Sequence, residues 1–319
     1  MPAGRYAPSP TGDLHLGNLR TALLAWAWAR STGRDFYLRL EDLDRGRARD
    51  PQGQLDDLRA IGIDWDGPVV VQSERTDLYE RALAQLREAG LVFECFCSRK
   101  DIREAASAAH APPSSYPGPC ADLNDDERDA KRAELAARGT KPALRLRPRT
   151  RQWTVLDELH GEYTGPVESV VLQRGDGEFA YNLAVVVDDH DMGIDQVVRG
   201  DDLLESSPTQ AYLADELYGE QPSYVHVPLV LGPTGARLAK RDGAVTLGAL
   251  RGEGVSVQDV TRYLVQSTGV SGASDAKSLL NCFDASEITR EAWALDLPLV
   301  LGDGSMTLRV PAHTMGRLE

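Results

Sequence analysis

Residues 7–18 read APSPTGDLHLGN, and this stretch joins a short predicted strand to a predicted helix. The strand covers Arg5–Ala7, proline and glycine then form a tight turn, and leucines recur at helical spacing from Leu16 onward. A helix that begins directly after a strand presents unpaired backbone amides and the positive end of its dipole to an anion. Gly12 and Gly17 would let a phosphate approach the backbone closely. The stretch therefore predicts a phosphate-binding turn, and a hydrogen-bonded turn without a ligand is the alternative.

The strand and helix pattern repeats along the first 94 residues. Alternating apolar residues at 36–40 predict a second strand that ends at Glu41. A helix is expected from an Asp50 cap and Pro51 to Gly62, a third strand at Val69–Val71, and a further helix from a Ser73 cap to Gly90. This βαβαβα order predicts a parallel sheet with right-handed crossovers, and such sheets bind ligands beyond the carboxyl ends of their strands.

The regular pattern then stops and later resumes, which predicts an α/β domain split by an insertion. The insertion contains a charged predicted helix near 125–138. Sheet-like sequence returns at Ser169–Leu172 and Tyr181–Val187, followed by a helix near 207–217 and a strand at Val225–Leu231. The expected division is a first half of the nucleotide-binding domain at 1–94, an insertion at 95–168, a second half at 169–250 and a partly helical C-terminal segment at 251–319.

The composition limits the class of protein. The 319 residues are 42% hydrophobic, which is enough to form a core, and no apolar run approaches the length of a membrane span. The N-terminus lacks the pattern of a secretory signal, so we expect a cytoplasmic protein without a membrane partner. The net charge of −14, from 35 basic and 49 acidic residues, repels polyanions and argues against nonspecific nucleic-acid binding. Any contact with RNA must be local.

Three cysteines in the insertion have the spacing of a metal site. Cys95 and Cys97 are followed by Cys120, and thiolates at such spacing are plausible zinc ligands in a loop-rich segment. His110 is the conventional fourth ligand, whereas Tyr116 is the alternative discussed below. Three structural cysteines without a metal remain possible, and Cys282 lies too far along the chain to belong to the cluster.

Four arginines follow the insertion helix at alternate positions. On a strand they would lie along one face and could follow a phosphate backbone, or they could form a solvated face paired with nearby carboxylates. These residues are Arg145, Arg147, Arg149 and Arg151.

Two separate motifs resemble one known family. Residues 7–18 resemble the "HIGH" signature of class I aminoacyl-tRNA synthetases in its glutamyl form, and residues 235–243, GARLAKRDG, resemble the "KMSKS" loop of the same family. Ala239 replaces the usual serine of that loop, and Arg241 ends it. The resemblance implies an enzyme with a Rossmann-like fold, which uses ATP with Mg²⁺ to activate an amino acid. The ATP-binding residues that it implies are His15, Gly17, Asn18, Arg237 and Lys240.

Two of these residues are the implied catalytic groups, His15 and Lys240. Formation of an adenylate moves negative charge onto pyrophosphate while the amino-acid carboxylate attacks the α-phosphorus. The ammonium group of Lys240 can stabilise that charge, and His15 can donate to a phosphate. A solvated basic loop is the alternative for Lys240.

The same resemblance implies a pocket for L-glutamate. Its side-chain carboxylate is assigned to Arg5, its ammonium group to Glu41 and its α-carboxylate to Arg199, because arginine forms a fork for carboxylates. Tyr181 would orient the substrate. The full implied set is Arg5, Ala7, Ser9, Glu41, Tyr181 and Arg199.

The length and the cysteine spacing favour one branch of this family. Residues 251–319 are too few for the helical anticodon-binding region of a full glutamyl-tRNA synthetase. The spacing Cys-x-Cys with Tyr-x-x-x-Cys is similar to the zinc site of glutamyl-queuosine tRNA(Asp) synthetases, which implies structural zinc on Cys95, Cys97, Tyr116 and Cys120. That branch activates glutamate without tRNA and transfers it to queuosine in tRNA(Asp). A truncated glutamyl-tRNA synthetase acting on a tRNA 3′ end and a catalytically silent paralogue are the alternatives.

Overall fold

A seven-stranded sheet forms the centre of the computed structural model, which describes residues 2–98, 101–102, 116, 118–232 and 245–294 and the strand backbones at 299–300 and 306–307. Its strands are β1 (Ala3–Tyr6), β2 (Asp35–Leu40), β3 (Val70–Val71), β6 (Gln152–Asp157), β7 (Gly161–Pro166), β9 (Ile194–Gly200) and β10 (Ser223–Val227). The order is β3-β2-β1-β9-β10-β6-β7. Neighbours run parallel from β3 to β6, and β7 pairs antiparallel with β6.

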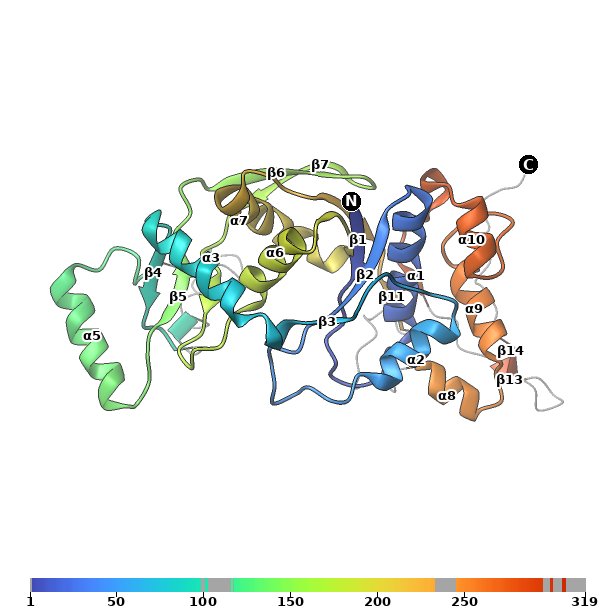
Figure 1. Ribbon diagram of the computed structural model, residues 1–319, viewed down its shortest axis with the longest axis horizontal. Helices are drawn as coiled ribbons and strands as arrows, with labels where there is room; N and C mark the ends of the chain where they lie inside the picture. Colours follow the sequence, from blue (N-terminus) through green and yellow to red (C-terminus); the bar gives the residue numbers. More distant parts are fainter. Residues whose placement is uncertain are drawn as a thin grey trace.

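Helices cover both faces of this sheet (Figure 1). They are α1 (Leu16–Ser31), α2 (Gln52–Ala60), α3 (Thr76–Glu88), α5 (Asp125–Ala137), α6 (Tyr181–Asp191), α7 (Ser207–Tyr218), α8 (Leu247–Gly252), α9 (Val257–Gln266) and α10 (Ala276–Cys282). Helix α1 packs between β1, β2 and β9 on one side and α9 and α10 on the other, so it is buried almost all round. Helices α6 and α7 pack together against β9 and β6 on the opposite face. The predicted parallel, Rossmann-like α/β fold is confirmed.

Close packing of α1 on β1 depends on a glycine in the strand. A Cβ atom added to Gly4 would lie 2.8 Å from Cβ of Ala29 in α1, a distance that side chains do not tolerate. Glycine and alanine therefore allow the first strand to approach the last turn of the first helix closely, which fixes α1 against β1.

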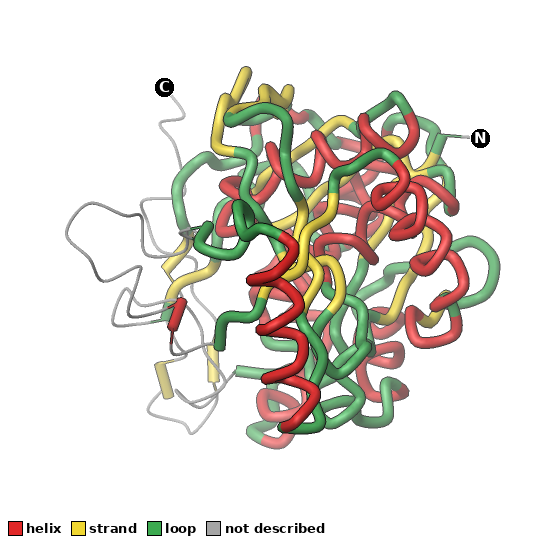
Figure 2. The backbone as a smooth tube through the Cα atoms, turned by 90° about the vertical axis from the view of Figure 1, so that its left-hand side faces the viewer, coloured by secondary structure: helices red, strands yellow, loops and turns green. Residues whose placement is uncertain are grey.

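A second, smaller sheet lies at the end of the molecule that carries α5, the end that faces the viewer in Figure 2. Its strands, in the order β4-β5-β8, are β4 (Val92–Cys95), β5 (Ala143–Leu146) and β8 (Val171–Gln173), all antiparallel. Helix α5 is the charged helix predicted in the insertion, and an Asn124 capping box begins it. Strands β6 and β7 belong to the large sheet, although they fall within the range 95–168 expected for the insertion.

The first half of the chain follows the predicted βαβαβα order, with small differences at the helix starts. Pro51 is the N-cap of α2, one residue after the predicted Asp50. Ser73 does not cap α3: its hydroxyl donates to Oδ2 of Asp42 at 2.6 Å, and the N-cap is Arg75. Tertiary hydrogen bonding has therefore replaced the local cap.

The strand predicted at Tyr181–Val187 is wrong, because these residues form most of helix α6. Val185, Val186 and Val187 are all buried, since α6 lies between the sheet and the helices α3 and α7. A short apolar run that is buried on every side has the same composition in a helix and in a strand. Strand β9, which follows α6 and carries Arg199, is among the strands that the sequence did not predict.

The pairing of β1 with β9 contains a register shift. Ala3 is paired with Ile194, but Gly4 is paired with Gln196, so Asp195 is an extra residue on β9. The Asp195 carboxylate accepts the backbone N–H of Ala3 at 2.9 Å, which stabilises the irregularity.

The four alternating arginines do not share a strand face. Strand β5 ends at Leu146, so of this set it contains Arg145 alone. The Arg145 guanidinium is buried and lies 4.1 Å from the centre of the Tyr116 ring, while Arg149 pairs with Glu216 at 3.0 Å. The predicted arrangement along one strand face is therefore wrong, whereas pairing with a nearby carboxylate, the alternative interpretation, occurs at the exposed Arg149.

The described part of the C-terminal segment is mainly helical, as predicted. Helices α8, α9 and α10 are accompanied by two short strand pairs, β11 (Val230–Leu231) with β12 (Trp293–Ala294) and β13 (Leu299–Val300) with β14 (Met306–Thr307). Among the described residues, no helix combines the length and the apolar character needed to cross a lipid bilayer.

Candidate functional site

A cleft of about 630 Å³ opens beyond the carboxyl ends of β1, β2 and β9. It contains every predicted glutamate-binding residue and three of the predicted ATP-binding residues. These residues are Arg5, Ala7, Ser9, His15, Gly17, Asn18, Glu41, Tyr181 and Arg199. Two other predicted residues, Arg237 and Lys240, lie at 233–244, outside the described residues.

The turn at residues 7–18 is held by reciprocal hydrogen bonds at the start of α1. His15 is the N-cap: its Nδ1 accepts the backbone N–H of Asn18 at 3.2 Å, and the Asn18 side chain accepts the backbone N–H of His15 at 3.3 Å. Because Nδ1 accepts a hydrogen bond, the ring proton of neutral His15 is on Nε2. A Cβ atom on Gly17 would lie 3.0 Å from the His15 ring, so a larger residue there would have to displace the ring by a few tenths of an ångström.

Gln54 of α2 fixes the other side of the same turn. Its side-chain amide donates to the carbonyl of Ser9 at 3.2 Å and to the carbonyl of Gly12 at 2.6 Å. Gln54 is 3% exposed, so these bonds form inside the protein rather than at its surface. The turn that could receive phosphate is thus attached to both α1 and α2.

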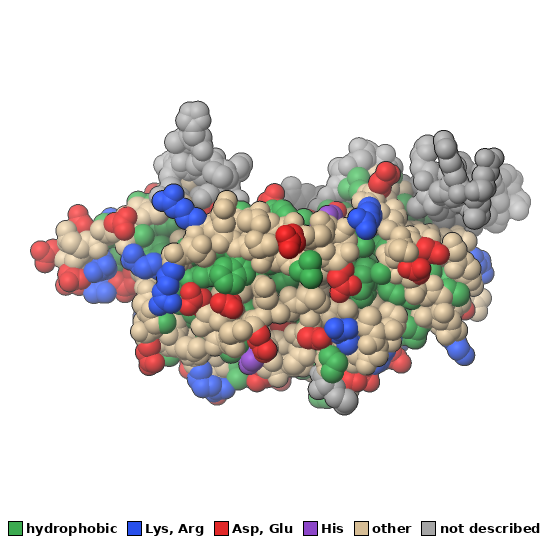
Figure 3. All heavy atoms as spheres, turned by 90° about the horizontal axis from the view of Figure 1, so that it is seen from above, with side chains coloured by type: hydrophobic (Ala, Val, Ile, Leu, Met, Phe, Trp, Pro, Cys, Tyr) green, Lys and Arg blue, Asp and Glu red, His purple; other side chains and the backbone are tan. Residues whose placement is uncertain are grey.

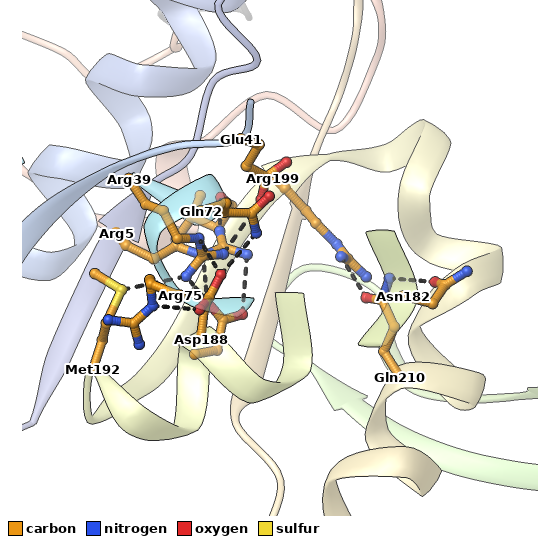
Figure 4. Close-up of polar contacts among 12 residues, drawn as sticks. Arg5, Arg39, Glu41, Gln72, Arg75, Asn182, Asp188, Met192, Arg199 and Gln210 are labelled. Carbon is orange, nitrogen blue, oxygen red and sulfur yellow. Dashed lines mark hydrogen bonds and ion pairs between the residues drawn. The ribbon is translucent and has the colours of Figure 1, made fainter. Parts of the chain in front are cut away.

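Arg5 is oriented by a carboxylate on α6 (Figure 4). Its Nε and one terminal nitrogen donate to the two oxygens of Asp189 at 3.2 and 3.3 Å, and its other terminal nitrogen donates to the carbonyl of Val198 at 3.3 Å. Burial acts to raise the pKa of Asp189, but the charges of Arg5 and Arg39 outweigh it and hold that pKa below its usual range. Asp189 therefore stays ionised and keeps the Arg5 fork aligned.

Arg39 connects this pair to Glu41. Arg39 is fully buried on β2, and its terminal nitrogens contact Asp189 at 2.7 Å and Glu41 at 3.3 Å. Burial raises the pKa of Glu41, and this effect exceeds the lowering by Arg39 and Arg5. Figure 4 shows Arg5, Arg39 and Glu41 pointing toward one another, with Asp188 nearby. The cluster places opposite charges side by side at the end of the cleft.

Arg199 enters the cleft from β9 and is held by residues from α7 and β10. One of its terminal nitrogens donates to Oε1 of Gln210 at 2.7 Å, the other donates to the Ser207 hydroxyl at 2.8 Å, and Nε donates to Nε2 of His226 at 3.0 Å. Tyr181 is the first residue of α6 and lines the same cleft. Burial raises the pKa of the Tyr181 hydroxyl, and the charge of Glu41 adds to this, so the hydroxyl stays protonated.

Sequence reasoning missed the residues that hold the two arginines. Asp189 and Arg39 are both buried charges with apolar residues near them in the sequence. Asp189 comes two residues after the apolar run that ends at Val187, and Arg39 lies between two leucines in β2. A charge inside a buried segment was the signal that could have identified them. His226, which lies in the strand β10, gave the same signal.

The predicted metal ligands that fall within the described residues converge in space. The sulfur atoms of Cys95, Cys97 and Cys120 lie within 4.8 Å of one another. The Tyr116 hydroxyl lies 3.3 Å from the sulfur of Cys95 and 3.7 Å from that of Cys97, so four donor atoms surround one point. This donor set could hold a metal ion of the kind that prefers thiolates. His110 lies outside the described residues.

Comparisons with known proteins agree with this arrangement. Residues 3–296 match the family model described as tRNA synthetases class I (E and Q), catalytic domain. A relative from Nocardia farcinica, named glutamyl-Q tRNA(Asp) synthetase, is 58% identical over 92% of this chain and 93% of its own length. A protein of the same name from Cutibacterium acnes is 46% identical over 88% of this chain and 79% of its own length.

Solved structures show the same relationship. The crystal structure of glutamate-tRNA synthetase from Elizabethkingia anophelis superposes with a TM-score of 0.76 at 25% identity, over 92% of this chain and 68% of that one. Proteins of this family use ATP and Mg²⁺, and the match covers the cleft and the cysteine cluster alike. The chain thus belongs to the family of class I tRNA synthetases for glutamate and glutamine, as an ATP-dependent ligase built on the catalytic domain.

Proposed function

We propose that the chain activates L-glutamate with ATP in the absence of tRNA and transfers it to the queuosine base of tRNA(Asp). The observation that carries the proposal is the cleft, which combines a phosphate-binding turn with two oriented arginines and a carboxylate. The names of the relatives from Nocardia farcinica and Cutibacterium acnes support the choice of acceptor.

The proposed roles follow from the charges in the cleft. Arg5 binds the side-chain carboxylate of glutamate, Glu41 binds its ammonium group, and Arg199 binds its α-carboxylate. Tyr181 orients the substrate between them. Fixed donors of this kind reject glutamine, because its neutral amide offers Arg5 one acceptor oxygen in place of two and turns an N–H donor toward the guanidinium.

ATP is proposed to bind at the turn between β1 and α1. His15 has its ring proton on Nε2 and can donate it to a phosphate, while Gly17 and Asn18 complete the site. The backbone amides of Leu16 and Asn18 donate to the carbonyl of Val245 and to His15, so the amide of Gly17 is the one offered to a phosphate from the first turn of α1. The proposed roles of Lys240 and Arg237 rest on the sequence motif alone. The α-carboxylate would attack the α-phosphorus of ATP, and Lys240 would stabilise the charge that develops on pyrophosphate.

The experiment that tests activation is ATP–pyrophosphate exchange with each proteinogenic amino acid, with Mg²⁺ and without tRNA. We expect exchange with glutamate and loss of that exchange in Lys240→Ala, with a smaller effect on glutamate binding because the contact develops in the transition state. Lys277→Ala, a change on the exposed side of α10, is the matched control. Equal exchange by both variants would remove Lys240 from the mechanism.

A second candidate is a glutamyl-tRNA synthetase that charges a tRNA 3′ end, and the superposed Elizabethkingia anophelis structure favours it. The two functions differ in the ester that they form. Labelled glutamate should be transferred to queuosine-containing tRNA(Asp) that lacks its 3′ CCA end, and not to tRNA(Asp) that lacks queuosine. ATP–pyrophosphate exchange that occurs only after tRNA(Glu) is added would support the second candidate instead.

The cysteine cluster is proposed to hold one structural zinc ion on Cys95, Cys97, Tyr116 and Cys120. Four ligands with no open position are typical of structural zinc sites. We expect one zinc per chain after purification without chelators, and loss of the metal and of thermal stability in Cys97→Ser. Cys282→Ser is the control, because Cys282 is exposed and lies on α10. Purified protein without zinc would contradict the site.

A further inference from the structure

Two fully buried residues behind Arg199 take no direct part in the proposed chemistry. His226 on β10 and Asp157 at the end of β6 are 0% and 1% exposed, and Nδ1 of His226 lies 2.6 Å from Oδ2 of Asp157. The opposite nitrogen of the same ring, Nε2, lies 3.0 Å from Nε of Arg199. A chain of three side chains therefore runs from the interior of the sheet to the cleft.

The surroundings of Asp157 determine where the His226 proton lies. One oxygen of Asp157 accepts the backbone N–H groups of Leu159 and His160, both at 2.9 Å. The other oxygen accepts the backbone N–H of His226 at 3.0 Å. Because this carboxylate faces N–H donors on both oxygens, it is ionised and accepts a hydrogen bond from the Nδ1–H of His226. Its pKa is lowered by these hydrogen bonds, although burial alone would raise it.

The opposite ring nitrogen must then be an acceptor. With the proton on Nδ1, Nε2 of His226 carries a lone pair, which faces the N–H of Arg199. Gln210 and Ser207 hold the two terminal nitrogens of Arg199, so all three nitrogens of the guanidinium have fixed partners. The plane of the guanidinium, and not merely its charge, is thereby set.

The charged and titratable groups around His226 favour its neutral form. Asp157 faces it from β6 and Arg199 from β9, His160 contacts its backbone carbonyl at 3.1 Å, and the Tyr224 ring stacks at 5.8 Å from its own strand. Burial lowers the pKa of His226, and the positive charge of Arg199 adds to this effect, while the bond to Asp157 opposes it. A protonated ring would direct an N–H at the N–H of Arg199.

We propose that Asp157 and His226 are positioning residues, which hold the guanidinium of Arg199 in the orientation that receives a carboxylate of the amino-acid substrate. The inference rests on the proposed role of Arg199 in glutamate binding. It makes His226 a hydrogen-bond acceptor whose tautomer is fixed by Asp157. Neither residue touches the substrate, so both act through Arg199.

If His226 and Asp157 position Arg199, substituting them should weaken glutamate binding and leave the rate of activation nearly unchanged. His226→Leu removes the acceptor, and we expect the KM for glutamate in pyrophosphate exchange to rise about tenfold, the effect of one hydrogen bond to a charged group. The KM for ATP and the kcat should change little. His226→Gln places an amide oxygen near the position of Nε2, and we expect it to restore most of the glutamate affinity. His190→Gln, at the exposed end of α6, is the matched histidine control.

A second variant keeps the test decisive if His226→Leu does not fold. Asp157→Asn has the same shape, but its amide group directs an N–H at Nδ1 and so favours the opposite tautomer of His226. We expect the KM for glutamate to rise in this variant as well. Folding of each variant is checked by its thermal unfolding and by its KM for ATP.

A purely structural role is separated from positioning by a double substitution. In an Arg199→Lys background the acceptor has no fork to orient, so His226→Leu should no longer raise the KM for glutamate. An equal rise in both backgrounds, or folded His226→Leu and Asp157→Asn variants with an unchanged KM, would overturn the inference while leaving glutamate activation intact. Absence of glutamate-dependent exchange in the unsubstituted chain would overturn the proposed function and this inference with it.

Discussion

Contacts within the described part of the fold use only some of the N–H groups of Arg5. Of its five N–H groups, three donate to Asp189 and to the carbonyl of Val198, and two take no partner among the described residues. A guanidinium whose orientation is fixed on one edge can offer the other edge to a substrate carboxylate without further ordering. Recognition therefore depends on the planar fork as well as on the positive charge.

Replacing Arg5 with lysine tests this dependence on geometry. Arg5→Lys keeps the charge but removes the fork, so we expect the KM for glutamate to rise about tenfold or more and discrimination against glutamine to fall. Pyrophosphate exchange with both amino acids measures both effects. Arg30→Lys, in a half-exposed ion pair on α1, should leave both unchanged. If Arg5→Lys keeps both the KM for glutamate and the discrimination against glutamine, Arg5 is not part of the glutamate pocket.

Glu41 should produce a dependence on pH. Burial raises its pKa above the ordinary value of 4.5, so it takes up a proton at a higher pH than an exposed carboxyl group does. The proposed ion pair with the substrate ammonium requires the ionised form, which is lost as the pH falls through this raised pKa. We expect the KM for glutamate to rise on acidification, beginning above pH 4.5, in exchange assays over a pH series.

The variant Glu41→Gln identifies the source of that effect. Its KM for glutamate should be high at every pH, and the part of the pH dependence caused by Glu41 should disappear. Glu80→Gln, at an exposed position of α3, should behave like the unsubstituted chain. An unaltered pH profile in Glu41→Gln would show that another group titrates.

Single residues also show which features of the candidate site could be predicted from the sequence alone. That Arg5, Glu41 and Arg199 line one site could be predicted from the family resemblance, and all three line the same cleft. Their partners could not, since Arg5 and Asp189 are separated by 184 residues and His226 lies 69 residues from Asp157. The pairing of buried charges is set by the three-dimensional fold, which local patterns do not encode.

At the scale of elements, periodicity identified α3 and the longer buried helix α1 but failed for the short apolar run in α6. Helix α3 has a single buried face and was predicted with nearly its observed ends. Helix α6 is buried along most of its length, so its apolar run at Val185–Val187 was interpreted as a strand. This exchange of a helix for a strand also concealed β9, the strand that carries Arg199, one of the two arginines proposed to bind glutamate.

The contact between β1 and α1 gives a prediction at this scale. Gly4→Ala forces a methyl group against Ala29, and we expect a loss of about 1–3 kcal/mol in the free energy of unfolding, the usual cost of overpacking a core. Urea unfolding followed by circular dichroism measures it. Gly252→Ala is the control, because an added Cβ meets nothing within 4 Å and the residue ends the exposed helix α8. Equal stability of the two variants would mean that β1 and α1 can separate without cost.

At the scale of the whole molecule, the net charge is acidic and a number of its arginines form ion pairs within the chain. The net charge is −14, and acidic and basic side chains are interspersed on the face shown in Figure 3. Several arginines are committed to carboxylates of the same chain, among them Arg34 with Asp195 and Arg75 with Asp188. A molecule of this kind does not attract RNA over a long distance.

The salt dependence of tRNA binding should therefore be weak. We expect the logarithm of the association constant to fall with the logarithm of the salt concentration with a slope shallower than about −3, because few phosphates are neutralised. Titration of labelled tRNA(Asp) at several KCl concentrations measures the slope. A slope near −6 or steeper would indicate an extended basic surface and contradict a local contact.

The extra residue in β9 has a consequence for how the sequence can change during evolution. A bulge absorbs one extra residue locally, so the residues on either side of it keep the faces that regular pairing with β1 would give them. Ile194 and Val197, three residues apart, therefore pack in one cluster with Ala3, and Arg199 lies on the same side of the sheet as Arg5, toward α6 and α7. Loss of Asp195 would restore regular pairing and leave Arg199 facing the cleft. The strand can therefore lose one residue at this point, but the loss of a second would turn Arg199 toward α1.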